Sequence, residues 1–236
     1  MTGRIRGFAA ATLASALLAA PITAQVTIGT PNTVQPNSFP FGSSVGFTTF
    51  QQIYNGSLFT GPLNINSISL FNSRGSGNLQ AGTFNLFLST TTVGASGITN
   101  TPANNRTGPL TAFATVTYAS NTAAPGMLTF TGAPFAFDPL AGNLLFEVQF
   151  TPIGFNTNAA FFDRIGVNDA ARSQVGTASN TSLVFGTNGS PNSGFVTQFG
   201  EAGVSVVPEP GTWALMAFGL TGLAMVARRK TSSMRV

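Results

Sequence analysis

The chain has 236 residues and is rich in Gly and Phe, but it contains no cysteine and no histidine. These absences exclude a disulfide framework, a thiol nucleophile, a Ser-His triad and a metal site built from Cys or His ligands. The formal net charge of +4 arises near the two ends, whereas residues 25–207 carry four arginines against five acidic residues, a net charge of −1, so the basic excess does not indicate nucleic-acid binding.

Residues 1–24 are predicted to be a secretory signal peptide, with a basic start and an apolar stretch over residues 8–20. Cleavage is expected between Ala24 and Gln25. The alternative cut after Ala20 is disfavoured, because the ring of Pro21 would directly follow the cleaved bond and hinder the peptidase. The apolar stretch is shorter than the roughly 20 residues that span a bilayer, which favours a cleaved leader over a membrane helix. The implied partners are the Sec translocon and signal peptidase.

Residues 25–207 alternate between apolar and polar side chains with a period of two, and Gly, Pro or Asn interrupts each stretch. This pattern predicts nine or ten strands in an all-β domain, a single β-sandwich with jelly-roll connectivity as the first expectation. A chain of this size with so many phenylalanines folds without disulfides. The expected strands are residues 45–54, 63–70, 84–89, 114–118, 127–131, 144–150, 159–163, 182–185, 195–199 and 204–207.

Two departures from strict alternation are expected in this domain. The apolar phase changes between residues 63 and 70, which predicts a β-bulge near Asn66 and Ser67. Residues 99–109 combine Asn, Pro, Gly and Arg106 into a predicted long loop, and the proline-rich segment 30–40 resembles a linker.

Candidate chemistry in this domain is sparse. Glycoside hydrolysis needs two carboxylates beside a cleft, and Glu147 occupies an outward-facing strand position, where it could serve. No cofactor is expected, although Asp138, Asp163 and Asp169 with Asn168 form an alternative set of oxygen ligands for calcium. Other acidic residues are expected to be solvated or paired.

Glycan binding usually employs exposed aromatic rings, and the single tryptophan, Trp213, lies outside this domain. Phe87 and Phe113 occupy outward phases of their strands and are the aromatic candidates. We expect both rings to be covered by a second packed face or by a loop.

Residues 212–227 are apolar and uncharged, and Arg228, Arg229 and Lys230 follow at once. The pattern predicts a short transmembrane helix, which covers only about 24 Å of a hydrocarbon core of roughly 30 Å. Positive residues stay on the cytoplasmic side, so residues 231–236 become a cytoplasmic tail and the domain lies outside.

Directly before this helix stands Pro208-Glu209-Pro210. The two prolines forbid a helix and favour an extended segment that a protease can bind. Together with the apolar helix and the cluster Arg228-Arg229-Lys230, the region 208–230 resembles the PEP-CTERM sorting signal. The resemblance implies recognition by exosortase, a membrane peptidase thought to remove the tail, and an origin among bacteria that produce exopolysaccharide and form biofilms.

These features together predict an exported, non-enzymatic protein that is anchored transiently in the membrane and then reaches the cell surface or extracellular matrix, in association with exopolysaccharide. A glycan-binding module of the cell surface is the alternative hypothesis. A carboxylate glycoside hydrolase that uses Glu147 is the third hypothesis.

Overall fold

The computed structural model describes residues 25–31, 36–43, 48–165, 171–176, 183–184 and 194–201. They belong to a compact unit, Thr23–Ala202. These residues form strands and short 3₁₀ helices, with no α-helix among them, which confirms the all-β prediction. None of the helices in these ranges is long and apolar enough to cross a membrane; the predicted signal peptide and the predicted helix 212–227 lie outside them.

Strands make up most of the regular structure in the described ranges. The strands are β1 (Gln25–Ile28), β2 (Pro36–Asn37), β3 (Thr49–Tyr54), β4 (Leu63–Phe71), β5 (Gly82–Thr91), β6 (Thr111–Tyr118), β7 (Met127–Phe137), β8 (Asn143–Pro152), β9 (Phe162–Asp163), β10 (Ala171–Gly176), β11 (Leu183–Val184) and β12 (Thr197–Glu201). The 3₁₀ helices are η1 (Gly56–Leu58), η2 (Ala95–Gly97) and η3 (Pro102–Asn105).

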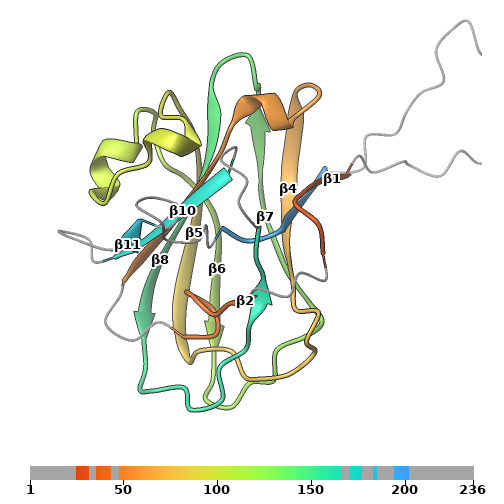
Figure 1. Ribbon diagram of the computed structural model, residues 1–236, viewed down its shortest axis with the longest axis vertical. Coiled ribbons are helices and arrows are strands. Elements are labelled where there is room, and N and C mark those ends of the chain that lie inside the picture. The colour runs from red at the N-terminus through yellow and green to blue at the C-terminus, as the bar shows by residue number, and fades with distance from the viewer. Residues whose placement is uncertain are drawn as a thin grey trace, which may run out of the picture. The chain divides into compact units, whose positions relative to one another are not determined.

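Two antiparallel sheets form the layers of the molecule, as Figure 1 shows. We call them sheet A, with the order β1-β12-β4-β7, and sheet C, with the order β11-β10-β3-β8-β5-β6. The chain passes from sheet A to sheet C between β1 and β3, β4 and β5, and β7 and β8, and from sheet C to sheet A between β3 and β4, β6 and β7, and β11 and β12. This strand order is that of a jelly roll, with β10 and β11 added beside β3.

The core fills the space between the inner faces of the two sheets, and phenylalanine rings dominate it. Phe41 lies at its centre, with ring centroids 5.2 Å from Phe84 of sheet C and 4.8 Å from Phe130 of sheet A. Such ring pairs add stabilisation beyond the area they bury. The alternation of the sequence therefore produces one continuous core without any disulfide.

Bulges shift the side-chain phase in two strands. The register between β4 and β12 shifts between Gly200 and Glu201, opposite Ser67 and Ile65, so the predicted bulge at Asn66 is present. A second bulge lies in β6, where Ala112 and Ala114 pair with consecutive residues of β5 and Phe113 is the extra residue. Both Phe113 and Ala114 therefore pack against the core.

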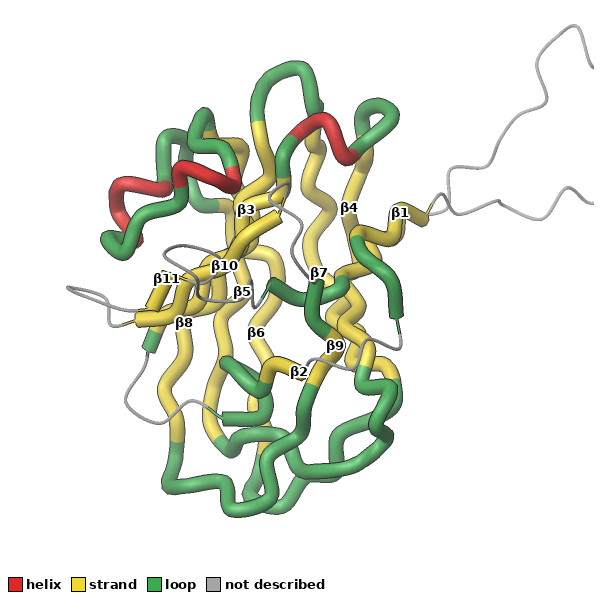
Figure 2. The backbone as a smooth tube through the Cα atoms, viewed as in Figure 1, coloured by secondary structure: helices red, strands yellow, loops and turns green. Residues whose placement is uncertain are grey.

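Figure 2 shows the loops gathered at the two ends of the sandwich. One end, which we call the exit pole, holds the loops 55–62, 92–110 and 138–142, and the chain leaves β12 toward it because Glu201 pairs with Ile65 near the start of β4. The opposite end, the distal pole, holds the loops 72–81, 119–126 and 153–161. The two poles differ in the exposed side chains that they carry.

Candidate functional site

Two rows of outward side chains on sheet A are polar and uncharged across all four strands, whereas the neighbouring pair Phe71 and Met127 is apolar. Ile28, Phe199 and Ile68 belong to the core, so the side chains that alternate with them point outward. Register places Thr27, Gln198, Ser69 and Thr129 in one row and Gln25, Gly200, Ser67 and Thr131 in the next.

Hydrogen bonds link the first of these two rows. The Gln198 Nε2 donates to Thr27 Oγ1 at 3.1 Å, and the hydroxyls of Ser69 and Thr129 lie 2.9 Å apart. In the second row a Cβ at Gly200 would lie only 2.3 Å from Ser67 Oγ, so glycine leaves room for that hydroxyl. The result is a sheet surface of hydroxyl and amide groups.

On sheet C the loop 92–110 covers the part of the outer face that lies near the exit pole, while Thr115 and Thr117 of β6 stay exposed. Ile53 and Leu145 of the sheet pack against Ala95 and Ile98 of this loop, and all four side chains are buried. Beside this cluster, Arg106 donates from Nε and a terminal nitrogen to the two carboxylate oxygens of Glu147. The predicted long loop is thus an ordered cover.

Glu147 is fully buried beneath that cover, and its carboxylate has several donors. Gln51 Nε2 donates to Oε2 at 2.7 Å, and Gln149 Nε2 donates to Oε1 at 2.7 Å, in addition to the two bonds from Arg106. Asn105 completes the network by donating to Gln51 Oε1 at 2.8 Å. These hydrogen bonds make Glu147 a residue that holds the loop 92–110 in place. Because its carboxylate is buried, it has no access to a glycosidic bond, and this argues against a catalytic role for Glu147.

The other acidic residues do not converge. Asp163 is 3% exposed and accepts hydrogen bonds from the backbone N–H and hydroxyl of Ser73, whereas Asp138 is exposed and caps the turn at Leu140. Within the described ranges no three acidic side chains are close enough to hold a metal ion. Asn168 and Asp169, the remaining members of the predicted calcium set, lie outside those ranges.

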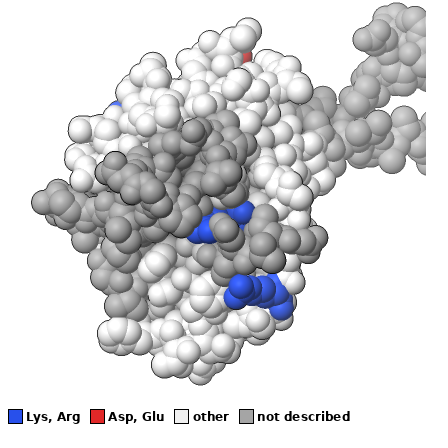
Figure 3. Space-filling model, viewed as in Figure 1, with Lys and Arg blue, Asp and Glu red and all other residues white. Residues whose placement is uncertain are grey.

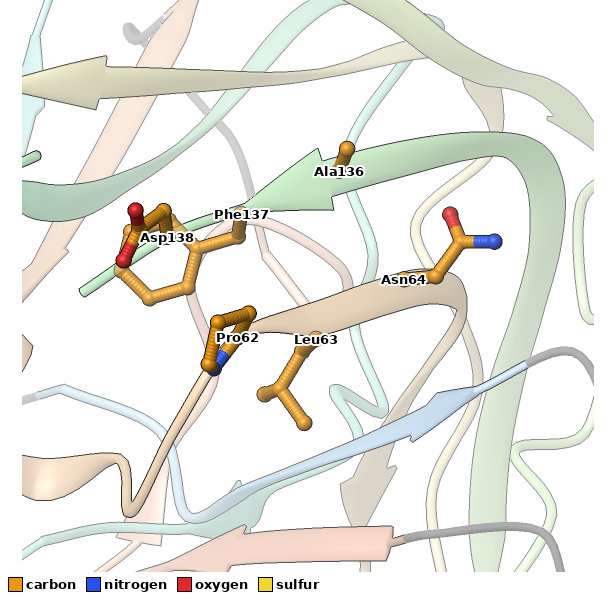
Figure 4. A pocket seen from close by; sticks show the side chains of 6 residues that line it. All are labelled: Pro62, Leu63, Asn64, Ala136, Phe137 and Asp138. Atoms are coloured by element: carbon orange, nitrogen blue, oxygen red, sulfur yellow. The ribbon is translucent and has the colours of Figure 1, made fainter. Parts of the chain in front are cut away.

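Two shallow hollows lie at the exit pole. The larger, of about 400 Å³, is lined by Pro62, Leu63, Asn64, Ala136, Phe137 and Asp138. Figure 4 shows the start of β4 on one side of it and the end of β7 on the other. The smaller, of about 330 Å³, lies between η1 and the loop that holds Pro139 and Leu140. Asp138 is the one carboxylate among the lining residues of either hollow, and a glycosidase needs a pair.

The distal pole carries the exposed aromatic rings. Phe155 is 80% exposed and Phe161 is 37% exposed, with Ile153 at 62% in the same loop. The guanidinium carbon of Arg74 lies 5.5 Å from the centroid of the Phe161 ring, a cation–π contact. Sequence reasoning missed Phe155 because it lies in a loop without alternation, where the surrounding Gly, Asn and Thr residues were the available signal. Phe161 was expected within the strand 159–163, but only Phe162 and Asp163 form a strand there, β9.

The aromatic candidates from the sequence occupy other places. Phe113 is 5% exposed and packs in the core because of the β6 bulge. Phe87 is half-buried on the outer face of sheet C, opposite Glu147. The expectation that both rings are covered is therefore met by Phe113 fully and by Phe87 in part.

Charge is scarce on the surface of the domain. On the face drawn in Figure 3 nearly all described atoms belong to uncharged residues; the larger arginine patches lie in the middle and lower parts, and acidic atoms appear only at the upper edge. Arg74 at the distal pole and Asp138 at the exit pole are exposed. The surface is therefore neutral and polar, with its few charges separated.

The described residues thus form a β-sandwich with a mostly uncharged surface, and the C-terminal region indicates the class of protein. Residues 206–230 match the model of the PEP-CTERM protein-sorting motif. The chain is thus a protein that carries a PEP-CTERM sorting motif, and the match supports exosortase-dependent sorting of an exported protein. Searches of curated proteins and of solved structures found no match.

The residues predicted to direct export lie mainly outside the described ranges. The matched segment includes Pro208, Glu209 and Pro210, and it extends through the cluster that ends at Lys230. Ala24 also lies outside, while Gln25, on the other side of the predicted cleavage, is the first residue of β1. Their individual roles stay predictions.

Proposed function

We propose that this protein is a non-enzymatic component of the cell surface or extracellular matrix, which exosortase sorts through the PEP-CTERM signal and which associates with exopolysaccharide. The sorting motif at residues 206–230 is the observation that carries the proposal. The domain is anchored by its C-terminal segment until the tail is removed, and it then works outside the cell.

The outer face of sheet A supports association with a polysaccharide matrix. Its rows of hydroxyl and amide groups, such as Thr27, Gln198 and Thr129, can exchange hydrogen bonds with water for hydrogen bonds with sugar hydroxyls. Each exchange contributes little free energy, so many contacts over a broad face suit a weak association with a hydrated polymer.

The arrangement of carboxylates supports a non-enzymatic role. Glu147 and Asp163 are buried and engaged in hydrogen bonds, and Asp138 stands alone at the edge of an open hollow. Hydrolysis of a glycosidic bond would require two accessible carboxylates. Incubating the exported protein with polysaccharides should release no reducing sugar; release that Asp138→Asn abolishes would contradict this part of the proposal.

Sorting is tested by mass spectrometry of the exported protein from cells with and without exosortase. We expect surface material that lacks residues 212–236 when exosortase is present, and full-length protein in the membrane fraction when it is absent. The double variant Pro208→Ala/Pro210→Ala should also stay full-length, and Arg235→Gln, beyond the motif, should be processed normally. An intact C-terminus on all surface material would refute exosortase processing.

Matrix association is tested separately in the processed protein. It should sediment with the exopolysaccharide of its own cells and pass into the medium when polysaccharide synthesis is blocked. Equal release in both cases would contradict the association while leaving the sorting result intact.

A glycan-binding module is the second candidate function. The observation that favours it is the exposure of Phe155 and Phe161 at the distal pole. A specific module would bind one kind of glycan by a small site, whereas a matrix component would bind by a broad face. A single substitution should therefore weaken glycan binding strongly in the first case and only slightly in the second.

A further inference from the structure

The distal pole presents an aromatic ring from a backbone that is held in place. Asn156, directly after Phe155, donates from Nδ2 to the carbonyl oxygens of Gly42 at 2.8 Å and Asn78 at 2.7 Å. On the other side, Gln80 Nε2 donates to the carbonyl oxygens of Ile153 at 3.3 Å and Gly154 at 3.2 Å. Ordering a loop on binding lowers the affinity for a ligand. A ligand that packs on Phe155 does not have this cost, because the loop backbone is already held in place.

The two loops of this pole are joined closely enough to act as one surface. Asn78 bridges Ala159, and the Ala160 N–H donates to the Asn78 carbonyl at 2.9 Å. Gly77 has φ +90°, and a Cβ there would lie 2.6 Å from the Ala159 carbonyl oxygen. Glycine is thus required for the loop that carries Arg74 to pack against the loop that carries Phe155 and Phe161.

The charge of this surface is positive and unneutralised. Arg74 is exposed, and its guanidinium lies over the Phe161 ring without an ion pair to any carboxylate in the described part of the chain. Asp163, two residues after Phe161, is buried and accepts hydrogen bonds from Ser73. The exposed guanidinium can donate to a ligand, and its planar N–H groups match a carboxylate in a two-pronged geometry.

We propose that the distal pole binds an acidic polysaccharide whose sugar units carry carboxylates. An exposed phenyl ring offers a large apolar contact area, on which the C–H face of a pyranose can pack, and Arg74 pairs with the carboxylate of that unit or of its neighbour. The proposal rests on the proposed function, which places the protein among exopolysaccharides, and it names the class of polymer and the site.

A lipid surface is the competing ligand for exposed phenylalanines beside an arginine. The composition of the site favours the polysaccharide. Arg74 is the one charged residue of the loops 72–81 and 153–161, and the residues around Phe155 include Gly, Asn and Thr. Binding to a membrane surface instead uses a broad apolar face with several basic residues.

The test measures retention of the purified exported protein on immobilised alginate, a polymer of uronic acids, and on neutral dextran, with EDTA present to remove calcium. We expect retention on alginate that falls as salt rises and little retention on dextran. Arg74→Gln and Phe155→Ala should each weaken alginate binding about tenfold. Leu140→Ala, which changes a 94% exposed side chain at the exit pole, should bind as the parent protein does.

Thermal melting of the same variants checks that the fold is kept, since Arg74 and Phe155 are exposed. The proposal is overturned if the protein is not retained on alginate or if neither distal-pole substitution weakens its retention. It is also overturned if the protein binds phosphatidylglycerol vesicles through Phe155 and does not bind alginate. These outcomes are independent of the sorting experiment, because processing at the C-terminus is read by mass on protein that need not bind any polymer.

Discussion

The hydroxyl of Tyr54 on β3 lies 2.6 Å from the hydroxyl of Thr197 on β12 and joins the two sheets by a hydrogen bond inside the core. The Tyr54 ring also meets Phe199 edge to face, with centroids 5.1 Å apart. Thr197 donates in turn to the carbonyl of Phe195 at 3.1 Å. A polar chain thus links the two sheets inside a core that is mostly apolar.

Alkaline pH should unfold the protein through its two tyrosines. Burial raises the pKa of Tyr54 more than the Thr197 hydrogen bond lowers it, and burial raises the pKa of Tyr118 to about 12. A raised folded-state pKa contributes stability that is complete below the unfolded value of about 10 and is lost as pH rises through the folded value. We therefore expect urea midpoints that are constant from about pH 7 to 9 and fall above about pH 10.

The tyrosine assignment can be isolated by substitution, because the chain has no histidine or cysteine and its one lysine is Lys230. Tyr54→Phe should lower the free energy of unfolding at neutral pH by about 1 kcal/mol through the lost hydrogen bond. The variant should also lose less stability than the parent protein above about pH 10. Equal alkaline losses in both proteins would contradict the role of Tyr54.

Breaking the ion pair beneath the loop 92–110 should destabilise the protein strongly. Arg106→Ala leaves the Glu147 carboxylate buried without its cation, which we expect to lower the free energy of unfolding by about 3 kcal/mol. Arg106→Met/Glu147→Gln should lose less, because the neutral amide can still bond to Gln51. Arg74→Ala is the control and should stay within about 0.5 kcal/mol of the parent protein in urea denaturation.

The contact between β6 and β7 requires a glycine. A Cβ at Gly132 would lie 2.3 Å from the carbonyl oxygen of Phe113, whereas a Cβ at Gly126 would meet nothing within 4 Å. Gly132→Ala should therefore lower the free energy of unfolding by about 2 kcal/mol through overpacking. Gly126→Ala should be neutral, and similar melting temperatures for the two variants would show that the strands are not packed as described.

Truncating a ring at the centre of the core should lower the free energy of unfolding far more than truncating an exposed ring. Phe41 is fully buried and contacts the rings of Phe84, Phe130, Phe162 and Phe195. Phe41→Ala should lower the free energy of unfolding by about 4 kcal/mol. Phe155→Ala, at an 80% exposed ring, should leave the urea midpoint almost unchanged.

Removal of divalent ions should not change the melting temperature. Asp138 and Asp163 are engaged separately, with Leu140 and Ser73, so we expect no shared calcium between them. Thermal melts with EDTA and with added calcium chloride should coincide. A higher melting temperature with calcium would restore the calcium hypothesis and direct attention to Asp169.

Sequence periodicity predicted the sandwich because half-buried strands show their faces directly. Phe84, Leu86 and Leu88 alternate in the sequence and are fully buried in the core, while Asn85 and Phe87 between them are only partly buried. The bulge near Asn66 was also predictable, since the apolar phase changes there. In β6 the bulge at Phe113 could not be read from the sequence, because alanines on both sides leave the phase undefined.

The environment of individual side chains was harder to predict than the strands. Glu147 has an outward phase, yet a loop some 40 positions earlier in the chain buries it, a contact that periodicity does not encode. Phe155 is exposed because the distant Gln80 side chain holds the carbonyl of Gly154 and the distant Asn78 carbonyl holds the side chain of Asn156. Long-range packing decided both outcomes, and local patterns carry little information about it.

The pairing of Gln25 with Gly200 places the first strand beside the last, and β1 has no other neighbour in sheet A. A chain that crosses a membrane from its N-terminus delivers β12 after every other strand. Until then β1 lacks a ladder partner and β4 keeps an unpaired edge, which is a site for aggregation. Completion of the sheet must therefore wait until residue 201 has crossed, and by then the sorting motif, which begins at residue 206, is already inside the translocation channel.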